Sequence, residues 1–282
     1  MNKVKIKCPS CSKTGNIEIS PNILKNSLRG LLAINVARDI VCDHSFIVYI
    51  DKNLSIRDYF VADFKIELPQ MSLDEIGKAD KLPSTDIVDI DLIKLNIPAI
   101  LLTYILKSIF LKQKIVIIDD QEFLHHHFTN FFKYITQNSF ETYIKIITDE
   151  KYKNNKKEYK DSMVFDNITI LRNVKKLINP KRLFIEKQMV SRFVSEGDLE
   201  YSYIILKNDI LKAFEFSKEI VNFINECKEK NVSINILEKS AQLEKEYKIK
   251  ISRIYLDFLI DIVENYFEVD CPSYSDSFIS SF

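Results

Sequence analysis

The stretch Cys8–Cys11 reads Cys-Pro-Ser-Cys, and the stretch Cys42–His44 reads Cys-Asp-His. A Cys-x-x-Cys turn places two sulfurs on one side of a metal ion, with backbone N–H groups directed at them. The second pair can close the tetrahedron with one sulfur and one imidazole nitrogen. Zn²⁺ prefers thiolate and imidazole ligands in this arrangement. The sequence therefore predicts one zinc site with the ligands Cys8, Cys11, Cys42 and His44.

The predicted zinc site is structural and not catalytic, because four protein ligands leave no open position for water. Two other interpretations of the cysteines are a redox Cys-x-x-Cys motif and a set of unrelated thiols. A redox pair normally opens a helix after a strand. Here Gly15 is expected to turn the chain and Asn16–Ile19 to return as a strand, so the zinc interpretation is favoured.

Short strands are expected on both sides of each ligand pair. Val4–Lys7 alternates apolar and basic residues and leads into Cys8, while Ile40–Val41 leads into Cys42. Phe46–Ile50 is expected to leave the second pair as another strand. Two such ligand-bearing turns resemble the zinc-ribbon family, and the resemblance covers about residues 1–65.

The gap between the two ligand pairs departs from the zinc-ribbon pattern, which has roughly 15–20 residues there. The extra length is expected to form a helical insertion capped by Asn22. The residues that share its helical stripe are Ile23, Leu24, Ser27, Leu28, Leu31 and Leu32. After the second pair, a β-hairpin of Ser45–Ile50 and Leu54–Phe64 is predicted, with Asn53 at a positive φ angle.

The fold class predicted for the whole chain is α/β, with a small β module followed by a larger α/β domain that has buried strands and C-terminal helices. The expected divisions are a zinc ribbon with a helical insertion at residues 1–68, an acidic linker at 69–89, an α/β domain at 90–230, a C-terminal helical pair at 231–269 and a flexible tail at 270–282.

The larger domain alternates predicted helices and strands, which is typical of a parallel sheet. A buried helix at Ile97–Leu111 precedes a strand at Lys114–Asp119, a helix at Glu122–Gln137 and a second buried strand at Tyr143–Thr148. Further strands are predicted at Phe165–Leu171, Leu183–Glu186 and Tyr201–Leu206. Further helices are predicted at Asp209–Lys230, Ile234–Glu246 and Ser252–Phe267, with Ser252 as an N-cap.

The segment Ile97–Phe132, a buried helix followed by a strand and a second helix, is similar to the core of DENN-type modules. That resemblance implies a protein partner, because DENN-type modules act on small GTPases. It has no diagnostic motif, so no residue role is transferred from it.

Composition limits the classes of function. The chain has 282 residues, and its 40 Lys and Arg residues balance its 40 Asp and Glu residues. This balance argues against a dedicated nucleic-acid-binding protein, in which basic residues dominate. The four glycines are isolated from one another, which excludes a P-loop and a dinucleotide-binding fingerprint.

A cytoplasmic location is expected. Residues 1–7 have no apolar core for a signal peptide, and residues 90–110 contain charges and a proline that argue against a membrane span. Three of the five cysteines are assigned to zinc, which leaves Cys227 and Cys271 unpaired. Unpaired cysteines are typical of a reducing compartment.

Asp119 and Asp120 form the most enzyme-like group, because acids that follow a buried parallel strand lie where α/β folds bind ligands. His127 could approach them from the next helix. However, consecutive helical residues point about 100° apart, so the three histidines at 125–127 cannot all face one ion. A ligand site at Asp119, Asp120 and His127 is therefore only an alternative.

A basic segment with interleaved tyrosines could contact phosphates. Its members are Lys151, Lys153, Lys156, Lys157, Lys160, Arg172, Lys175 and Lys176, with Tyr152 and Tyr159 between them. A solvated surface in a lysine-rich chain explains the same pattern and is the favoured interpretation.

The sequence most favours a non-catalytic zinc-binding adaptor or regulatory protein that binds other proteins. The first alternative is a nucleic-acid-binding or transcription-related protein that uses the ribbon and the basic segment. The second alternative is an enzyme with a site at the Asp119 strand end. The C-terminal helices are expected to be either core or a docking surface.

Overall fold

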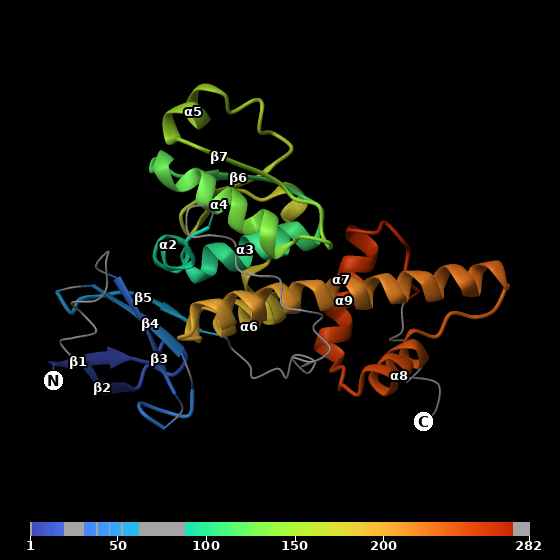
Figure 1. The fold of residues 1–282 in the computed structure, drawn as a ribbon, viewed down its shortest axis with the longest axis horizontal. Coiled ribbons are helices and arrows are strands. Elements are labelled where there is room, and N and C mark those ends of the chain that lie inside the picture. Colours follow the sequence, from blue (N-terminus) through green and yellow to red (C-terminus); the bar gives the residue numbers. More distant parts are fainter. Residues whose placement is uncertain are drawn as a thin grey trace.

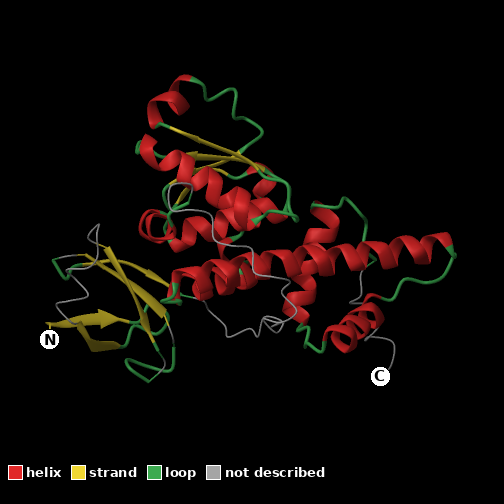
Figure 2. Ribbon diagram, viewed as in Figure 1, coloured by secondary structure: helices red, strands yellow, loops and turns green. Residues whose placement is uncertain are grey.

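The computed structural model describes residues 2–19, 31–37, 39–44, 46–51, 53–61 and 88–272. Within them the chain is a mixed α/β protein, with small sheets in the N-terminal region and a larger, helix-rich part beside them (Figures 1 and 2). We call the described part of residues 2–61 the lobe and residues 88–272 the body. The lobe lies at one end of the molecule in Figure 1.

The lobe contains two antiparallel sheets. Strand β1 (Asn2–Lys7) pairs with β2 (Thr14–Ile19). The second sheet has the order β3 (Leu31–Val36), β4 (Phe46–Asp51) and β5 (Ile56–Phe60). The alternation of apolar and basic residues explains β1, because Val4 and Ile6 are buried while Lys3, Lys5 and Lys7 are exposed.

The predicted strands at Val4–Lys7 and Asn16–Ile19 and the β4–β5 hairpin are confirmed. Two local predictions are wrong. The residue with positive φ in the hairpin turn is Leu54, at 63°, and not Asn53. Leu31 and Leu32 belong to β3 and are not helical. The rest of the predicted insertion, including Asn22, lies outside the described residues, as do most of the predicted linker and residues 273–282.

A four-stranded sheet forms the outer part of the body. Its order is β7 (Tyr143–Ile147), β6 (Lys114–Ile118), β8 (Met163–Asp166) and β9 (Thr169–Arg172). Strand β6 runs parallel to β7 and β8, whereas β9 returns antiparallel. The predicted parallel pairing of β6 and β7 is therefore confirmed.

Two details of this sheet differ from the prediction. Strand β7 is an edge strand whose residues are exposed or half-buried up to Ile147, so it is not buried on both faces. The single strand predicted at Phe165–Leu171 is instead the β8–β9 hairpin, which turns at Asn167 with a φ angle of 50°.

Helices fill the remainder of the body. They are α2 (Ile90–Asn96), α3 (Ala99–Phe110), α4 (Glu122–Ile135), α5 (Asp149–Asn154), α6 (Phe184–Ser195), α7 (Leu199–Glu229), α8 (Ile236–Tyr247) and α9 (Arg253–Asn265). Helix α3 is buried on almost all sides, as its composition predicts. In the described residues, no single helix is long and apolar enough to cross a membrane; α2 and α3 reach that length only together, across a bend of 104°.

The strands predicted at Leu183–Glu186 and Tyr201–Leu206 are wrong, because both segments begin helices, α6 and α7. A short apolar run fits either structure, and the residues that follow decide between them. In α7 the buried positions recur every three or four residues over the whole helix, which favours a helix packed along one face.

Helix α9 belongs to the core and is not a free docking surface. Leu259, Ile262 and Val263 are fully buried in the same apolar cluster as α3 and α7. The hydroxyl of Ser217 on α7 donates to the carbonyl of Leu259 at 3.3 Å. Ser252 caps the helix by accepting from the N–H of Tyr255, as predicted.

The lobe packs directly on the body. Ile47, Tyr49 and Phe60 of the β4–β5 hairpin join the core of the body and not the core of the lobe. The opposite face of β4, with Val48 and Ile50, closes the lobe's own core. Strand β4 therefore separates two apolar clusters, because successive side chains point to opposite faces.

Candidate metal centre

The four predicted ligands come together in the lobe. One ligand atom from each of Cys8, Cys11, Cys42 and His44 lies within 4.8 Å of the other three. Sγ of Cys42 and Nδ1 of His44 lie 3.5 Å apart. Tetrahedral zinc ligands at standard bond lengths lie about 3.3–3.8 Å apart. The four residues are close enough to bind one metal ion.

The first ligand pair lies in the turn between β1 and β2. The N–H of Cys8 donates to the carbonyl of Lys13 at 2.7 Å, and the N–H of Ser12 donates to the carbonyl of Cys8 at 2.9 Å. Ser12 takes a positive φ angle of 63°, which lets the chain reverse directly after the second cysteine. This turn brings both sulfurs to one side.

The second pair lies in the connection from β3 to β4. The N–H of Asp39 donates to the carbonyl of Cys42 at 2.9 Å, and Asp39 has a φ angle of 70°. The strand predicted at Ile40–Val41 is therefore wrong: these residues form the turn, and the Ile40 side chain is 52% exposed. This turn places Cys42 and His44 next to Cys8 and Cys11.

Gly15 allows the two turns to approach each other closely, which the sequence alone did not reveal. A Cβ atom at Gly15 would lie 2.8 Å from Cγ2 of Val41 on the second turn. That separation is far below van der Waals contact, so any side chain at this position would push the turns apart. Gly15 is required for close approach, and not for a left-handed turn.

Burial and neighbouring donors give the two inner thiols different acidities. Burial acts to raise the pKa of Cys8, but backbone N–H groups of Cys11 and Ser10 and the neighbouring thiols outweigh it and lower that pKa below its usual value. Burial, together with the neighbouring Cys8 and Cys11, raises the pKa of Cys42 to about 11, although the backbone of His44 opposes the shift. Metal binding must therefore displace a proton from Cys42.

The second predicted site does not form as expected. Oδ1 of Asp119 accepts the N–H of Gln121 at 2.6 Å, and Oδ1 of Asp120 accepts the N–H of Asp149 at 2.9 Å. These contacts tie together the loops that follow β6 and β7. Both carboxylates thus have a local structural role at the strand ends.

Asp119, Asp120 and His127 do not form a group that could hold a metal. The ring that reaches back is His125, whose Nε2 lies 2.7 Å from the carbonyl oxygen of Asp119. The ring of His127 lies beside that of His126, with centroids 3.8 Å apart and the ring planes tilted by 42°. In the part of the chain that the structure describes, only the cysteine and histidine group of the lobe has the geometry to hold a metal.

The basic segment is exposed, but its tyrosines are not. Tyr152 and Tyr159 are buried, and their rings stack 6.1 Å apart beneath the sheet with Val116 and Val164. They cannot act as stacking platforms for bases. Lys153 forms an ion pair with Asp149 of the same helix.

The other predicted cations lie around or beyond these tyrosines. Exposed side chains belong to Lys151, Lys153, Lys156, Lys157, Lys160, Lys175 and Lys176. Arg172 on β9 is half-buried. Lys175 and Lys176 take positive φ angles of 51° and 55° after the edge strand, so they project from an irregular turn and not from a helix face.

Sequence reasoning missed a buried ion cluster in the body. Nζ of Lys107 on α3 lies 2.8 Å from Oδ2 of Asp261 on α9 and 3.3 Å from Oε1 of Glu186 on α6. Burial acts to lower the pKa of Lys107, but the two carboxylates raise it. One feature of the sequence could have predicted this cluster, namely a single lysine within an apolar helix. A charge buried in such a helix needs an oppositely charged partner.

The chain matches no protein-family model, and no curated protein matches its sequence. The metal centre is therefore inferred from its own residues and geometry.

Proposed function

We propose that the protein is a non-catalytic zinc-binding adaptor or regulatory protein that acts by contacting other proteins. The observation that carries the proposal is the convergence of one imidazole and three thiols on a single point. Calcium and magnesium prefer oxygen ligands, whereas a Cys₃His set suits zinc. Its four ligands leave no coordination position for a substrate, which supports a structural role.

Zinc would join the two sheets of the lobe. Two of the buried residues in the lobe's apolar cluster, Cys8 and Cys42, are themselves ligands. A module with so small a core usually depends on a metal for its stability. The metal would therefore set the shape that the lobe presents to a partner.

The β8–β9 hairpin supports an interaction with protein. Ile168 at the turn and Leu171 on β9 are each 47% exposed. Strand β9 is an edge of the four-stranded sheet, so its outer backbone groups can pair with a strand from another chain. Apolar side chains beside an open edge are typical of strand addition.

The two alternatives receive less support from the side-chain contacts. A nucleic-acid interface would need accessible aromatic rings, and Tyr152 and Tyr159 are buried. A catalytic site at the end of β6 would need free carboxylates, and Asp119 and Asp120 accept backbone hydrogen bonds.

The zinc part of the proposal is tested by elemental analysis of the purified full chain. One zinc per chain is expected in the wild type, and Cys8→Ser and Cys42→Ser should lose it. Cys227→Ser and Cys271→Ser are matched controls, because these thiols lie outside the cluster. Zinc that is retained in Cys42→Ser, or absent from the wild type, would contradict the proposal.

The partner part is tested by affinity purification from the native cell. A protein that co-purifies with the wild type, in the presence of nuclease, should be lost with Leu171→Lys. Phe123→Lys is the matched control, because Phe123 is also an exposed apolar residue, 56% accessible, but lies on α4. Recovery of nucleic acid without protein would favour the first alternative instead.

A further inference from the structure

A cavity of about 290 Å³ lies at the seam between lobe and body. Tyr49 and Arg57 line it from the β4–β5 hairpin, and Lys94 and Pro98 line it from the α2–α3 junction. Ile168 of the β8–β9 turn closes another side. Its volume is at the lower end of the roughly 300–1,000 Å³ of small-molecule sites, which often lie between domains.

The hydroxyl of Tyr49 lacks a hydrogen-bond partner. Tyr49 is only 6% exposed, and its hydroxyl oxygen is buried without a partner among the described residues. The group beside it is the backbone N–H of Ala99, the first residue of α3. That N–H acts to lower the pKa of Tyr49 against the effect of burial, so it lies where it can donate to the phenol oxygen, while the O–H group has no acceptor among the described residues. Buried polar groups are nearly always satisfied, so this arrangement indicates a missing acceptor.

The start of α3 is also short of acceptors. Its N-cap is Pro98, which makes no side-chain hydrogen bond, and its first turn has no acid. By contrast, Asp89 caps α2 and Asp198 caps α7. The free N–H groups and the dipole at the start of a helix favour an anion.

The charged side chains around the cavity are mostly cationic. Nζ of Lys94 donates to the carbonyl of Glu196 at 2.7 Å, and burial lowers the pKa of Lys94 to about 8 although Asp91 and Glu196 oppose this shift. A nearby anion would compensate the buried ammonium group. Asp58 is the one acid that lines the described cavity, and its Oδ1 accepts the N–H of Tyr59.

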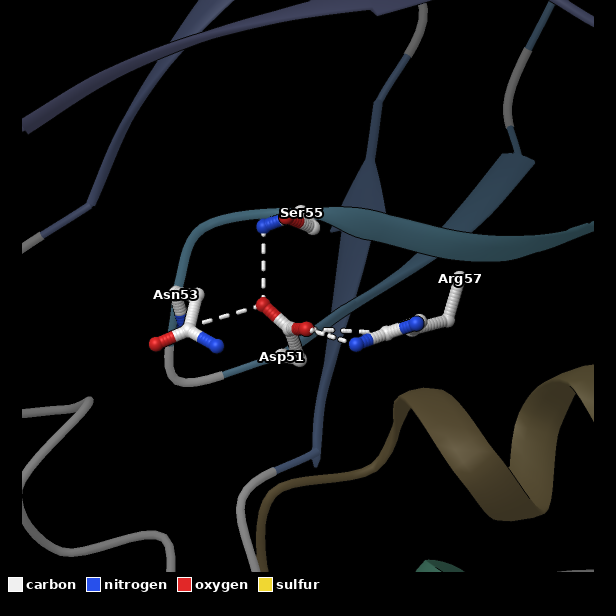
Figure 3. A network of polar contacts seen from close by, with 4 residues as sticks. All are labelled: Asp51, Asn53, Ser55 and Arg57. Carbon is white, nitrogen blue, oxygen red and sulfur yellow. Dashed lines mark hydrogen bonds and ion pairs between the residues drawn. The ribbon is translucent and has the colours of Figure 1, made fainter.

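Arg57 is held in place at the rim of the cavity. Figure 3 shows the carboxylate of Asp51 between the hairpin turn and the guanidinium group. Its Oδ1 accepts the N–H groups of Asn53 and Ser55 at 2.9 and 2.8 Å, and its Oδ2 accepts Nε of Arg57 at 2.8 Å. The fixed turn presents a fixed cation beside the seam.

We propose that this seam cavity binds a small organic anion with a phosphate or carboxylate head. The head accepts the hydroxyl of Tyr49 and N–H groups at the start of α3, and its charge is balanced by Lys94 and Arg57. The apolar part lies against Ile97, Pro98 and Ile168. This site is separate from the metal centre, and it adds a ligand to the proposed adaptor function.

Calorimetric titration of the full metal-containing chain tests the proposal. The anionic probes are phenyl phosphate and phenylacetate, and benzyl alcohol is a neutral probe with the same ring. At least one anion should bind saturably at one site per chain, at least about tenfold more tightly than benzyl alcohol. No saturable binding of either anion, or equal binding of the alcohol, would overturn the proposal.

Tyr49→Phe is the decisive variant, because it removes only the hydroxyl. Binding of the anion should weaken about tenfold through loss of one hydrogen bond to a charged group. The unfolding midpoint without ligand should stay the same or rise, because a buried hydroxyl without a partner is removed. Tyr59→Phe is the matched control, because Tyr59 lies on the same sheet outside the cavity, and it should bind as the wild type does. Unchanged anion binding by Tyr49→Phe would sink the inference.

Discussion

The lobe and the body are stabilised in different ways. The body has a main apolar cluster that runs from α2 to α9 and includes large aromatic side chains such as Phe110 and Phe216, and a smaller cluster on the other face of its sheet. The lobe has a much smaller cluster, and two of its buried members are the thiols of Cys8 and Cys42. Apolar burial is extensive in the body, whereas in the lobe the proposed metal would add ligation to a small buried cluster.

The two regions should therefore lose stability in response to different changes. In the body, the costly errors are cavities and unpaired buried charges. In the lobe, the costly errors are loss of the metal and loss of the contact between the two turns. Perturbations can therefore be chosen that affect one region and leave the other intact.

Metal removal should have the largest effect. Binding of a structural zinc supplies about 10 kcal/mol or more to the folding of a small module. In the presence of a strong chelator, amide protons of β1–β4 should exchange rapidly while those of α3 and α7 stay protected. Hydrogen exchange read by mass spectrometry measures both regions in one sample. Persistent protection of the lobe would show that its apolar cluster suffices.

Loss of one buried charge partner should have the next largest effect, and only in the body. Nη1 of Arg192 on α6 donates to both carboxylate oxygens of Asp209 on α7, at 3.0 and 2.9 Å. Arg192→Met would leave Asp209 buried without that partner and should destabilise the body by about 3–5 kcal/mol. Urea unfolding measures the loss, and the metal content should not change.

Arg182→Met is the matched control for this charge, because Arg182 is exposed. It should change stability by less than about 0.5 kcal/mol. Equal effects of the two substitutions would mean that the Arg192–Asp209 pair does not support the body.

Addition of a single methyl group at Gly15 should push the two turns of the lobe apart. Gly15→Ala would place a Cβ atom 2.8 Å from Val41, and overpacking of this kind costs about 1–3 kcal/mol. The expected result is a faster loss of metal to a chelator. Gly197→Ala is the matched control, because an added Cβ there meets no atom within 4 Å. The double variant Gly15→Ala with Val41→Ala should recover part of the loss.

Acid should act on the two regions in opposite directions, with the smallest effect in the body. Burial raises the pKa of Asp209 from 3.8 to about 6, although Arg192 and Lys212 oppose the shift. A raised folded-state pKa gives a stabilising contribution that is complete below pH 3.8 and is lost as the pH rises through about 6. Between pH 7 and 5 this residue should therefore add about 1 kcal/mol to the body.

The lobe should respond in the opposite way, because protons compete with the metal for thiolates and imidazole. Urea unfolding of the body and metal release from the lobe, measured from pH 7 to 5, test the contrast. Asp209→Asn should remove the gain in the body. A body that weakens as steeply as the lobe would contradict the assignment.

The sequence predicted the features that depend on near neighbours. Cysteine spacing identified all four residues that come together in the lobe, and the run at Lys114–Ile118 predicted β6 because a buried parallel strand has a distinctive composition. Short runs such as Tyr201–Leu206 were misread, since the helix there is fixed by packing over the whole of α7.

Features that join distant residues were beyond the sequence. The pairing of Lys107 with Asp261, the contact of Gly15 with Val41, and the approach of Tyr49 to Ala99 all depend on how elements meet in space. The lysines of the basic segment are exposed, which fits either a solvated surface or a phosphate-binding one, and only the structure shows Tyr152 in the core.

The ion cluster of Lys107 has a consequence for synthesis. Its partner Asp261 is separated from it by 154 positions, on the last helix that the structure describes. When the ribosome has produced α3, this nearly all-apolar helix is still exposed, because the helices that bury it have not yet been synthesised. The nascent chain must keep that segment from self-association until α6 emerges to pack on it, and Lys107 gains its second carboxylate only when α9 follows.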